Sequence, residues 1–130
     1  MHIEHMAIWV LDLERMRTFY ETYFNCVAND KYVNTTKNFS SYFLSFPSGG
    51  ARLELMQMPG IPASDNDALT QFTGLIHFAI SLDSESAVDD LTNRLRQDGY
   101  TIVGEPRRTG DGYYESIIFD PEQNRLELMA

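Results

Sequence analysis

The chain has 130 residues and carries 19 acidic against 10 basic side chains, which gives a formal net charge of −9. Nucleic acid and anionic membrane surfaces are therefore excluded as expected partners, because an acidic protein is repelled by both. Hydrophobic residues make up 43% of the chain and aromatic residues 12%, which predicts a compact domain with a packed core. No apolar stretch approaches the roughly 20 residues that cross a bilayer.

The first residues lack a basic segment followed by an apolar run, so we expect no signal peptide. The single cysteine, Cys26, can form no internal disulfide. Its isolation is typical of a reducing compartment and predicts a cytoplasmic protein. Because Cys26 directly follows a predicted helix, we interpret it as a structural residue and not as a reactive thiol.

The first half of the chain predicts one strand, one helix and three more strands. Residues 2–10 are typical of a strand. Asp12 can cap a helix that ends near Asn25, a residue that tolerates the left-handed conformation. The buried face of this helix is predicted from helical spacing: Leu13, Met16, Phe19, Tyr20, Tyr23 and Phe24. The strands that follow are expected at about 27–33, 40–46 and 51–58, with a turn at 48–50.

The second half predicts the same order of elements. Residues 74–82 form a strand, Asp83 or Ser84 caps a helix, and Gly99 ends it. The inner face of this helix is predicted to hold Ala87, Val88, Leu91 and Leu95. Strands are expected at about 101–108, 113–120 and 124–129, separated by turns at 111–112 and 120–124.

An internal repeat links the two halves. The segment His5 to Ile8 resembles His77 to Ile80, and Arg-Leu-Glu-Leu-Met occurs at both 52–56 and 125–129. The two histidines are 72 residues apart and Glu54 and Glu127 are 73 apart, which indicates a duplicated module. We therefore predict an α+β fold of two βαβββ modules, at about 1–58 and 74–130, joined by a linker at 59–73 within a single domain 1–130.

Four polar residues occupy matching places in the two modules. His5 and His77 lie in the first strand of each module, and Glu54 and Glu127 lie between two leucines in the last strand. If the modules pair about a pseudo-two-fold axis, both His–Glu pairs can converge on one point. Two imidazoles and two carboxylates suit zinc, nickel, cobalt, iron or manganese better than calcium or a soft ion. The sequence thus predicts a divalent metal site.

These features resemble the vicinal oxygen chelate superfamily, in its glyoxalase I and bleomycin-resistance protein group, over nearly the whole chain. The resemblance implies curved mixed sheets around a metal, nickel or zinc first, held by His5, Glu54, His77 and Glu127. It also implies a homodimer in which each site takes one module from each subunit. The full His/Glu/His/Glu set is the glyoxalase I pattern, because the three-ligand branches lack an acidic ligand at the position of Glu54.

The resemblance further implies a metal-dependent lyase or isomerase that moves a proton through a metal-bound enediolate of a small vicinal-oxygen substrate. Glu127 is our first choice of base and Glu54 the second. Glutathione-using relatives carry Arg where this chain has Trp9 and Asn where it has Met58, so a more apolar substrate than glutathione is expected. The alternatives are a ligand-sequestering protein of the bleomycin-resistance type and an epimerase of the same superfamily.

Further side chains are candidates for the substrate cavity. Trp9 shares the His5 face of its strand and is expected to form a wall, with core packing as the alternative. Arg107 and Arg108 precede a turn and could meet an anionic substrate, although either could be a solvated strand end. Tyr113 and Tyr114 have opposite parity, so we expect only one of them, assigned here to Tyr113, to face the cavity.

Overall fold

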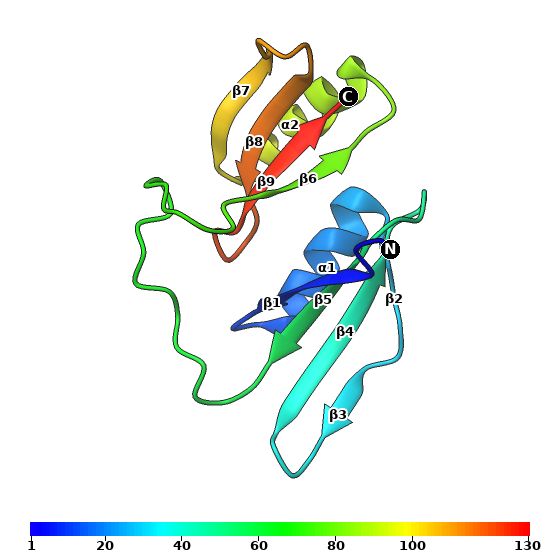
Figure 1. Cartoon of the computed structure of the whole chain (residues 1–130), viewed down its shortest axis with the longest axis vertical. Helices are drawn as coiled ribbons and strands as arrows, with labels where there is room; N and C mark the ends of the chain where they lie inside the picture. The colour runs from blue at the N-terminus through cyan, green and yellow to red at the C-terminus, as the bar shows by residue number, and fades with distance from the viewer. The chain divides into compact units, whose positions relative to one another are not determined.

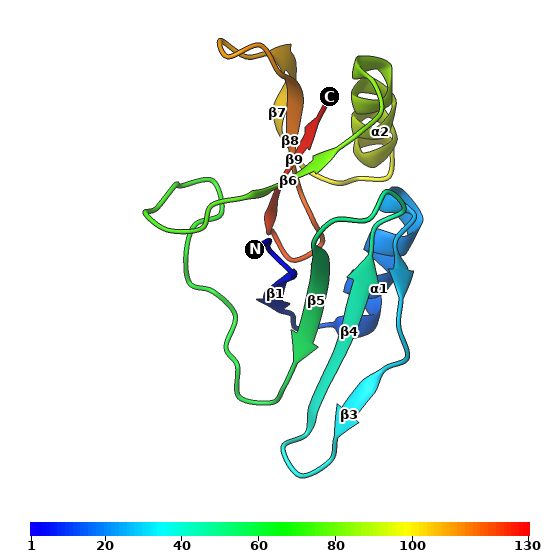
Figure 2. The same ribbon diagram turned by 45° about the vertical axis from the view of Figure 1, so that its right-hand side comes forward.

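The computed structural model describes all 130 residues, which form two compact units, Met1–Ser64 and Asp65–Ala130. Each unit has one helix and one mixed sheet (Figures 1 and 2). The first unit contains β1 (His5–Trp9), α1 (Leu13–Phe24), β2 (Val27–Ala28), β3 (Tyr32–Asn34), β4 (Phe39–Ser45) and β5 (Arg52–Gln57). The second contains β6 (Phe78–Ser81), α2 (Glu85–Gln97), β7 (Ile102–Arg108), β8 (Tyr114–Phe119) and β9 (Arg125–Met129). The predicted α+β fold of two βαβββ modules is confirmed.

Both sheets have the same topology. The strand order is β1-β5-β4-β2 in the first unit, with β3 also on β4, and β6-β9-β8-β7 in the second. In each unit the first strand runs parallel to the last, and the remaining pairs are antiparallel. The registers match as well, because Ala7 lies opposite Glu54 and Ala79 lies opposite Glu127. The sequence repeat is therefore also a repeat of strand register.

Helix α1 forms where its caps and apolar spacing predict it. The Asp12 side chain accepts a hydrogen bond from the Arg15 N–H at 2.9 Å, and Asn25 ends the helix with φ of 53°. Between them the apolar face packs against β4 and β5. Its buried members are Leu13, Met16, Phe19, Tyr20 and Phe24. Tyr23, which was expected on this face, is only half-buried.

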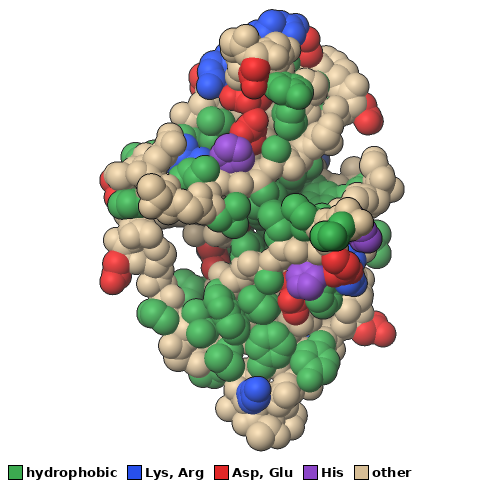
Figure 3. All heavy atoms as spheres, in the orientation of Figure 1, with side chains coloured by type: hydrophobic (Ala, Val, Ile, Leu, Met, Phe, Trp, Pro, Cys, Tyr) green, Lys and Arg blue, Asp and Glu red, His purple; other side chains and the backbone are tan.

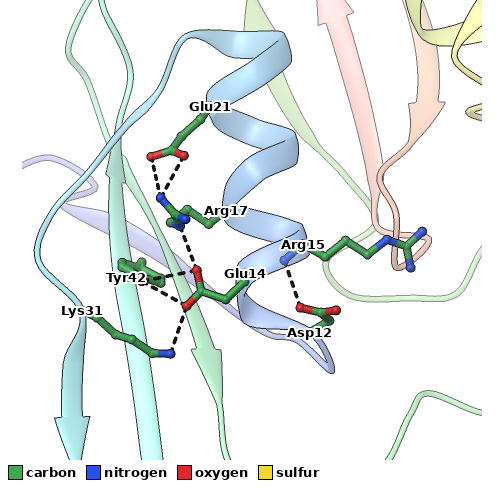
Figure 4. A network of polar contacts seen from close by, with 7 residues as sticks. All are labelled: Asp12, Glu14, Arg15, Arg17, Glu21, Lys31 and Tyr42. Carbon is green, nitrogen blue, oxygen red and sulfur yellow. Dashed lines mark hydrogen bonds and ion pairs between the residues drawn. The ribbon is translucent and has the colours of Figure 1, made fainter.

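A polar network along one side of α1 links the helix to β4 of its sheet (Figure 4). Glu14 accepts hydrogen bonds from Lys31 Nζ at 3.0 Å and from the Tyr42 hydroxyl of β4 at 3.1 Å. Arg17 bridges Glu14 and Glu21 at 3.1 Å each. The Lys31 hydrogen bond is the largest cause that lowers the pKa of Glu14, although burial opposes it. One carboxylate thus joins the helix, β4 and the segment before β3.

Helix α2 packs on β8 and β7 in the second unit. Ser84 caps it by accepting from the Ala87 N–H at 3.2 Å. Gly99, with φ of 88°, lets the Tyr100 N–H return to the Leu95 carbonyl at 2.9 Å. A buried hydrogen bond of 2.7 Å between the hydroxyls of Thr92 and Ser116 joins α2 to β8. Periodicity of apolar residues alone did not identify this polar core contact.

Two strand predictions need correction. The strand expected at 27–33 is divided into β2 and β3, and between them the Asn29 side chain accepts from the Phe43 N–H of β4 at 2.8 Å in place of a backbone carbonyl. The strand expected at 74–82 covers only Phe78–Ser81, so His77 directly precedes it, and His5 is the first residue of β1. Neither helix is long and apolar enough to cross a membrane.

Candidate metal-binding pairs

Each sheet has one face toward its helix and one face away from it, and strand alternation decides which side chains occupy each. In β5, Leu53 and Leu55 are buried under α1, so Glu54 points to the other face. In β9, Leu126 and Leu128 are buried and Glu127 takes the equivalent place. The alternation of Leu and Glu therefore places each glutamate on the face away from the helix.

The first His–Glu pair consists of His5 and Glu54. Their nearest nitrogen and oxygen, Nε2 and Oε2, are 3.8 Å apart. His5 lies diagonally across from Glu54, because Ala7, two residues later on the same strand face, is directly opposite Glu54 in the register. The Glu54 side chain is 15% exposed and the His5 side chain 39%, so both can be reached from the open face of the sheet. Phe43, opposite Glu54, meets the His5 ring edge-on with centroids 5.2 Å apart.

The second pair repeats this arrangement with His77 and Glu127. Here Nε2 and Oε2 are 2.9 Å apart, and the side chains are 39% and 13% exposed. Ala79 again occupies the register position beside the glutamate. Ile117 lies opposite Glu127, in the place that Phe43 holds opposite Glu54. The two pairs are thus alike in exposure and in the register position of their glutamates, although His5 begins β1 and His77 directly precedes β6.

The separations within each pair fit two ligands of one ion. Metal–nitrogen and metal–oxygen bonds of about 2.0–2.2 Å at tetrahedral or octahedral angles separate neighbouring ligand atoms by about 3–3.5 Å. The 2.9 Å of the second pair and the 3.8 Å of the first lie close to that range. No group of three or more His, Cys, Asp or Glu side chains is arranged to hold a metal ion within the chain. The donor set of each pair nevertheless suits a divalent transition ion.

Glu4 and Arg52, which surround His5, were not predicted from the sequence as parts of the site. Glu4 accepts a hydrogen bond from His5 Nδ1 with one carboxylate oxygen and from Arg52 with the other. Hydrogen bonds with His5 first and Arg52 second lower the pKa of Glu4. Since Glu4 precedes the strand and is exposed, alternation within β1 gave no signal for it.

A second carboxylate accompanies Glu127. Glu115 of β8 is 8% exposed, and Arg107 of β7 donates to it at 2.9 Å. A hydrogen bond with Glu127 is the largest cause that raises the pKa of Glu115, followed by burial, while Arg107 opposes the rise. Glu115 was not predicted from the sequence, although the parity of β8 places it on the same face as Ile117. Arg107 lies on this face too, and its role toward substrate stays a prediction.

The neighbouring candidates take different positions. Arg108 forms an ion pair with Glu85 of α2, and the Tyr114 hydroxyl donates to Asp89 of α2 at 2.8 Å. Both therefore belong to the helix side of the second sheet. Tyr113 directly precedes β8 and is 51% exposed, and its place in a substrate cavity stays a prediction. Met58 follows β5 and is half-buried.

An aromatic strip borders the first pair. Trp9 shares the His5 face of β1 and is 42% exposed, so it is not a core residue. Its ring meets Phe39 edge-on at 6.1 Å, and Phe39 in turn contacts Tyr32 at 6.0 Å. Figure 3 shows hydrophobic side chains gathered over β4 and β5 on this face of the first unit. The face that carries Glu54 is thus largely apolar.

Cys26 is separate from these pairs. It is 5% exposed, and burial raises the pKa of its thiol to about 12. A thiol with that pKa is protonated at neutral pH and is a poor nucleophile. Its environment agrees with a structural role.

Comparison with known proteins adds the family context. Residues 2–128 match the family model described as Glyoxalase/Bleomycin resistance protein/Dioxygenase superfamily. A relative named uncharacterized protein YqjT, from Bacillus subtilis (strain 168), is 25% identical over 131 residues, which cover 98% of each chain.

Solved structures share the fold. A glyoxylase/bleomycin resistance protein/dioxygenase domain from Frankia sp. EAN1pec superposes with a TM-score of 0.81 at 20% identity, over 99% of this chain and 96% of the other. A glyoxalase I mutant from Zea mays has a TM-score of 0.79 at 26% identity. That alignment covers 98% of this chain but 44% of the maize protein, so the chain spans less than half of its length.

Proposed function

The chain belongs to the Glyoxalase/Bleomycin resistance protein/Dioxygenase superfamily, and from this premise we propose that it is a metal-dependent lyase or isomerase of the glyoxalase type. The observation that carries the proposal is the equivalence of the two His–Glu pairs, with nitrogen–oxygen separations of 3.8 Å and 2.9 Å. The likeness to a maize glyoxalase I supports it.

In this proposal His5, Glu54, His77 and Glu127 together hold one divalent ion, with nickel or zinc as the first candidates. Imidazole and carboxylate donors in equal number suit either metal. When bound, such an ion supplies Lewis-acid polarisation of two neighbouring substrate oxygens, which acidifies the adjacent C–H group. We further propose a homodimer in which each ion takes one pair from each subunit.

The proton transfer itself falls to a carboxylate of this chain. Glu127 and Glu54 are both mostly shielded from solvent, at 13% and 15% side-chain exposure. We assign the base to Glu127, because Glu115 and Arg107 beside it form a polar environment that can hold a proton near its oxygens. Glu54 lies opposite Phe43 in the strand register. Strands β4 and β5 contain no second carboxylate that could act as Glu115 does beside Glu127.

The surroundings of the first pair favour an apolar substrate. Trp9 and Met58 stand where glutathione-using relatives carry Arg and Asn, so two polar anchors for the tripeptide are replaced. An unmatched carboxylate of glutathione would lose a charge-assisted hydrogen bond, about 1.5–3 kcal/mol. We therefore propose a small substrate with two vicinal oxygens and an apolar or aromatic group.

The aromatic strip also favours one alternative, a protein that sequesters an aromatic ligand without turnover. Trp9 and Tyr32 are 42% and 54% exposed on the Glu54 face, and the net charge of −9 would attract a cationic compound. The second alternative, an epimerase of the superfamily, uses the same proton-transfer chemistry on an acyl thioester.

One experiment separates these functions. Nickel- or zinc-loaded protein would be assayed against thiol hemithioacetals, aromatic dicarbonyls and acyl-CoA epimers, with Glu127→Gln as the matched inactive variant. We expect turnover that needs metal and that falls at least a hundredfold in the variant. Ligand capture by metal-free protein, without turnover of any compound by loaded protein, would favour sequestration.

A further inference from the structure

The ring of His5 has a carboxylate near each of its two nitrogens. Nδ1 hydrogen-bonds to Glu4, while Nε2 lies 3.8 Å from Glu54. The second oxygen of Glu4 accepts a hydrogen bond from Arg52. Glu4 is therefore held in place at one oxygen while it binds His5 with the other, although its own side chain is 54% exposed.

Phe43 supports both partners of Glu4. The Arg52 guanidinium lies over the Phe43 ring, 4.2 Å from its centroid. The His5 ring stands nearly perpendicular to the same ring, at 87° and 5.2 Å between centroids. Since Phe43 lies opposite Glu54 in the strand register, this platform fixes the orientation of His5 directly beside the candidate ligand Glu54.

The second unit lacks this arrangement although it repeats the same five-residue sequence. Ile76 precedes His77, so no carboxylate is available at the position of Glu4. Arg125, the counterpart of Arg52, instead donates to the Ala68 carbonyl at 3.0 Å and lies over Phe119. His77 uses its Nε2 toward Glu127 at 2.9 Å. The two histidines are thus held by different atoms.

We propose that Glu4 is a positioning residue for His5. Its carboxylate, anchored by Arg52, keeps the neutral imidazole in the tautomer with hydrogen on Nδ1 and leaves the lone pair of Nε2 on the Glu54 side. A carboxylate that accepts from one ring nitrogen fixes the tautomer and raises the basicity of the other nitrogen, which is the one that binds metal. The metal role rests on the proposed function, whereas the tautomer does not.

The tautomer can be measured without metal. Long-range proton–nitrogen spectra of metal-free protein at about pH 8, where imidazole is neutral, distinguish the two forms. We expect His5 with hydrogen on Nδ1 and His77 with hydrogen on Nε2. Glu4→Ala should move His5 toward the other form, Glu4→Gln should retain the wild-type form because its amide oxygen still accepts, and His77 should not change. Wild-type His5 with hydrogen on Nε2, or no change in Glu4→Ala, would overturn the proposal.

A cobalt titration tests the consequence for metal. Glu4→Ala should bind Co²⁺ about tenfold more weakly than wild type, the low end of the loss for an outer-shell partner. Glu85→Ala is the matched control, because Glu85 also pairs with an arginine and is 52% exposed. An unchanged Co²⁺ affinity in Glu4→Ala would overturn the link to metal binding. If wild type binds no Co²⁺, the proposed function fails, and the tautomer spectra still decide the role of Glu4.

Discussion

Glu115 of β8 and Glu127 of β9 lie diagonally across neighbouring strands on the same face of the second sheet, and Arg107 donates to Glu115 at 2.9 Å. Hydrogen bonding with Glu127, then burial, then repulsion between the two carboxylates raise the pKa of Glu115 above its ordinary value. A raised pKa in the folded state means that Glu115 contributes stability below its unfolded value of about 4.5, and that this stability is lost as pH rises through the folded pKa.

Arg107→Met should increase the loss of folding stability that accompanies ionisation of Glu115 as pH rises. Without the guanidinium, an ionised Glu115 is left 8% exposed with no cation. We expect the free energy of unfolding to fall by about 1–3 kcal/mol at pH 7 and by much less near pH 4, where Glu115 is protonated. Urea unfolding at the two pH values measures both. Arg108→Met is the control, because its ion pair with Glu85 is exposed on both sides and should contribute only a few tenths of a kcal/mol. Equal losses in the two variants would contradict the assignment.

The Glu14 network should show the opposite pH dependence. Lys31 lowers the pKa of Glu14 in the folded state, so its contribution is present above about pH 4.5 and is lost as pH falls through the lowered value. Glu14→Gln should reduce the free energy of unfolding at pH 7 by less than about 1 kcal/mol, because Glu14 is 50% exposed and solvent screens the ion pair. The difference should shrink as pH falls below about 4.5 through the lowered pKa. A difference that stays constant over that fall would refute the electrostatic cause.

Cys26 should be inert in the native protein. Because burial raises the pKa of its thiol to about 12, thiol-specific reagents at pH 8 should label native protein far more slowly than protein in guanidinium chloride. The labelling rate should track unfolding and should be the same with and without metal. Rapid labelling of native protein would contradict the structural role.

The shared-site proposal can be tested by mixing two inactive variants. If each ion takes one pair from each subunit, a dimer of His5→Ala with Glu127→Gln contains one intact site and one doubly altered site. Random exchange of equal amounts should then restore about a quarter of the wild-type metal sites, because about half of the dimers are mixed. Restoration of none would indicate that each site lies within one chain.

The parts of the site that could be predicted are those marked by a sequence repeat or by strand alternation. Glu54 and Glu127 were found because the Arg-Leu-Glu-Leu-Met repeat is exact and strand alternation then fixes their face. The ends of α1 followed from Asp12 and Asn25, and those of α2 from Ser84 and Gly99.

Other features had no periodic signal. Glu4 reaches His5 from outside the strand, and its role depends on Arg52, which is 48 residues away in the chain. The division of the 27–33 strand depends on a side chain that binds the backbone of β4. Contacts of this kind arise from tertiary packing, so local pattern does not encode them.

The central claim is that His5, Glu54, His77 and Glu127 hold one divalent ion. Its most direct test is calorimetric titration of metal-free protein with Ni²⁺ and Zn²⁺, together with single replacements of each of the four residues. We predict one ion per chain in wild type and, in every variant, a loss of affinity larger than the tenfold loss typical of an outer-shell partner. Wild-type protein that binds neither ion, or a replacement of Glu54 or Glu127 that leaves the affinity unchanged, would contradict the claim.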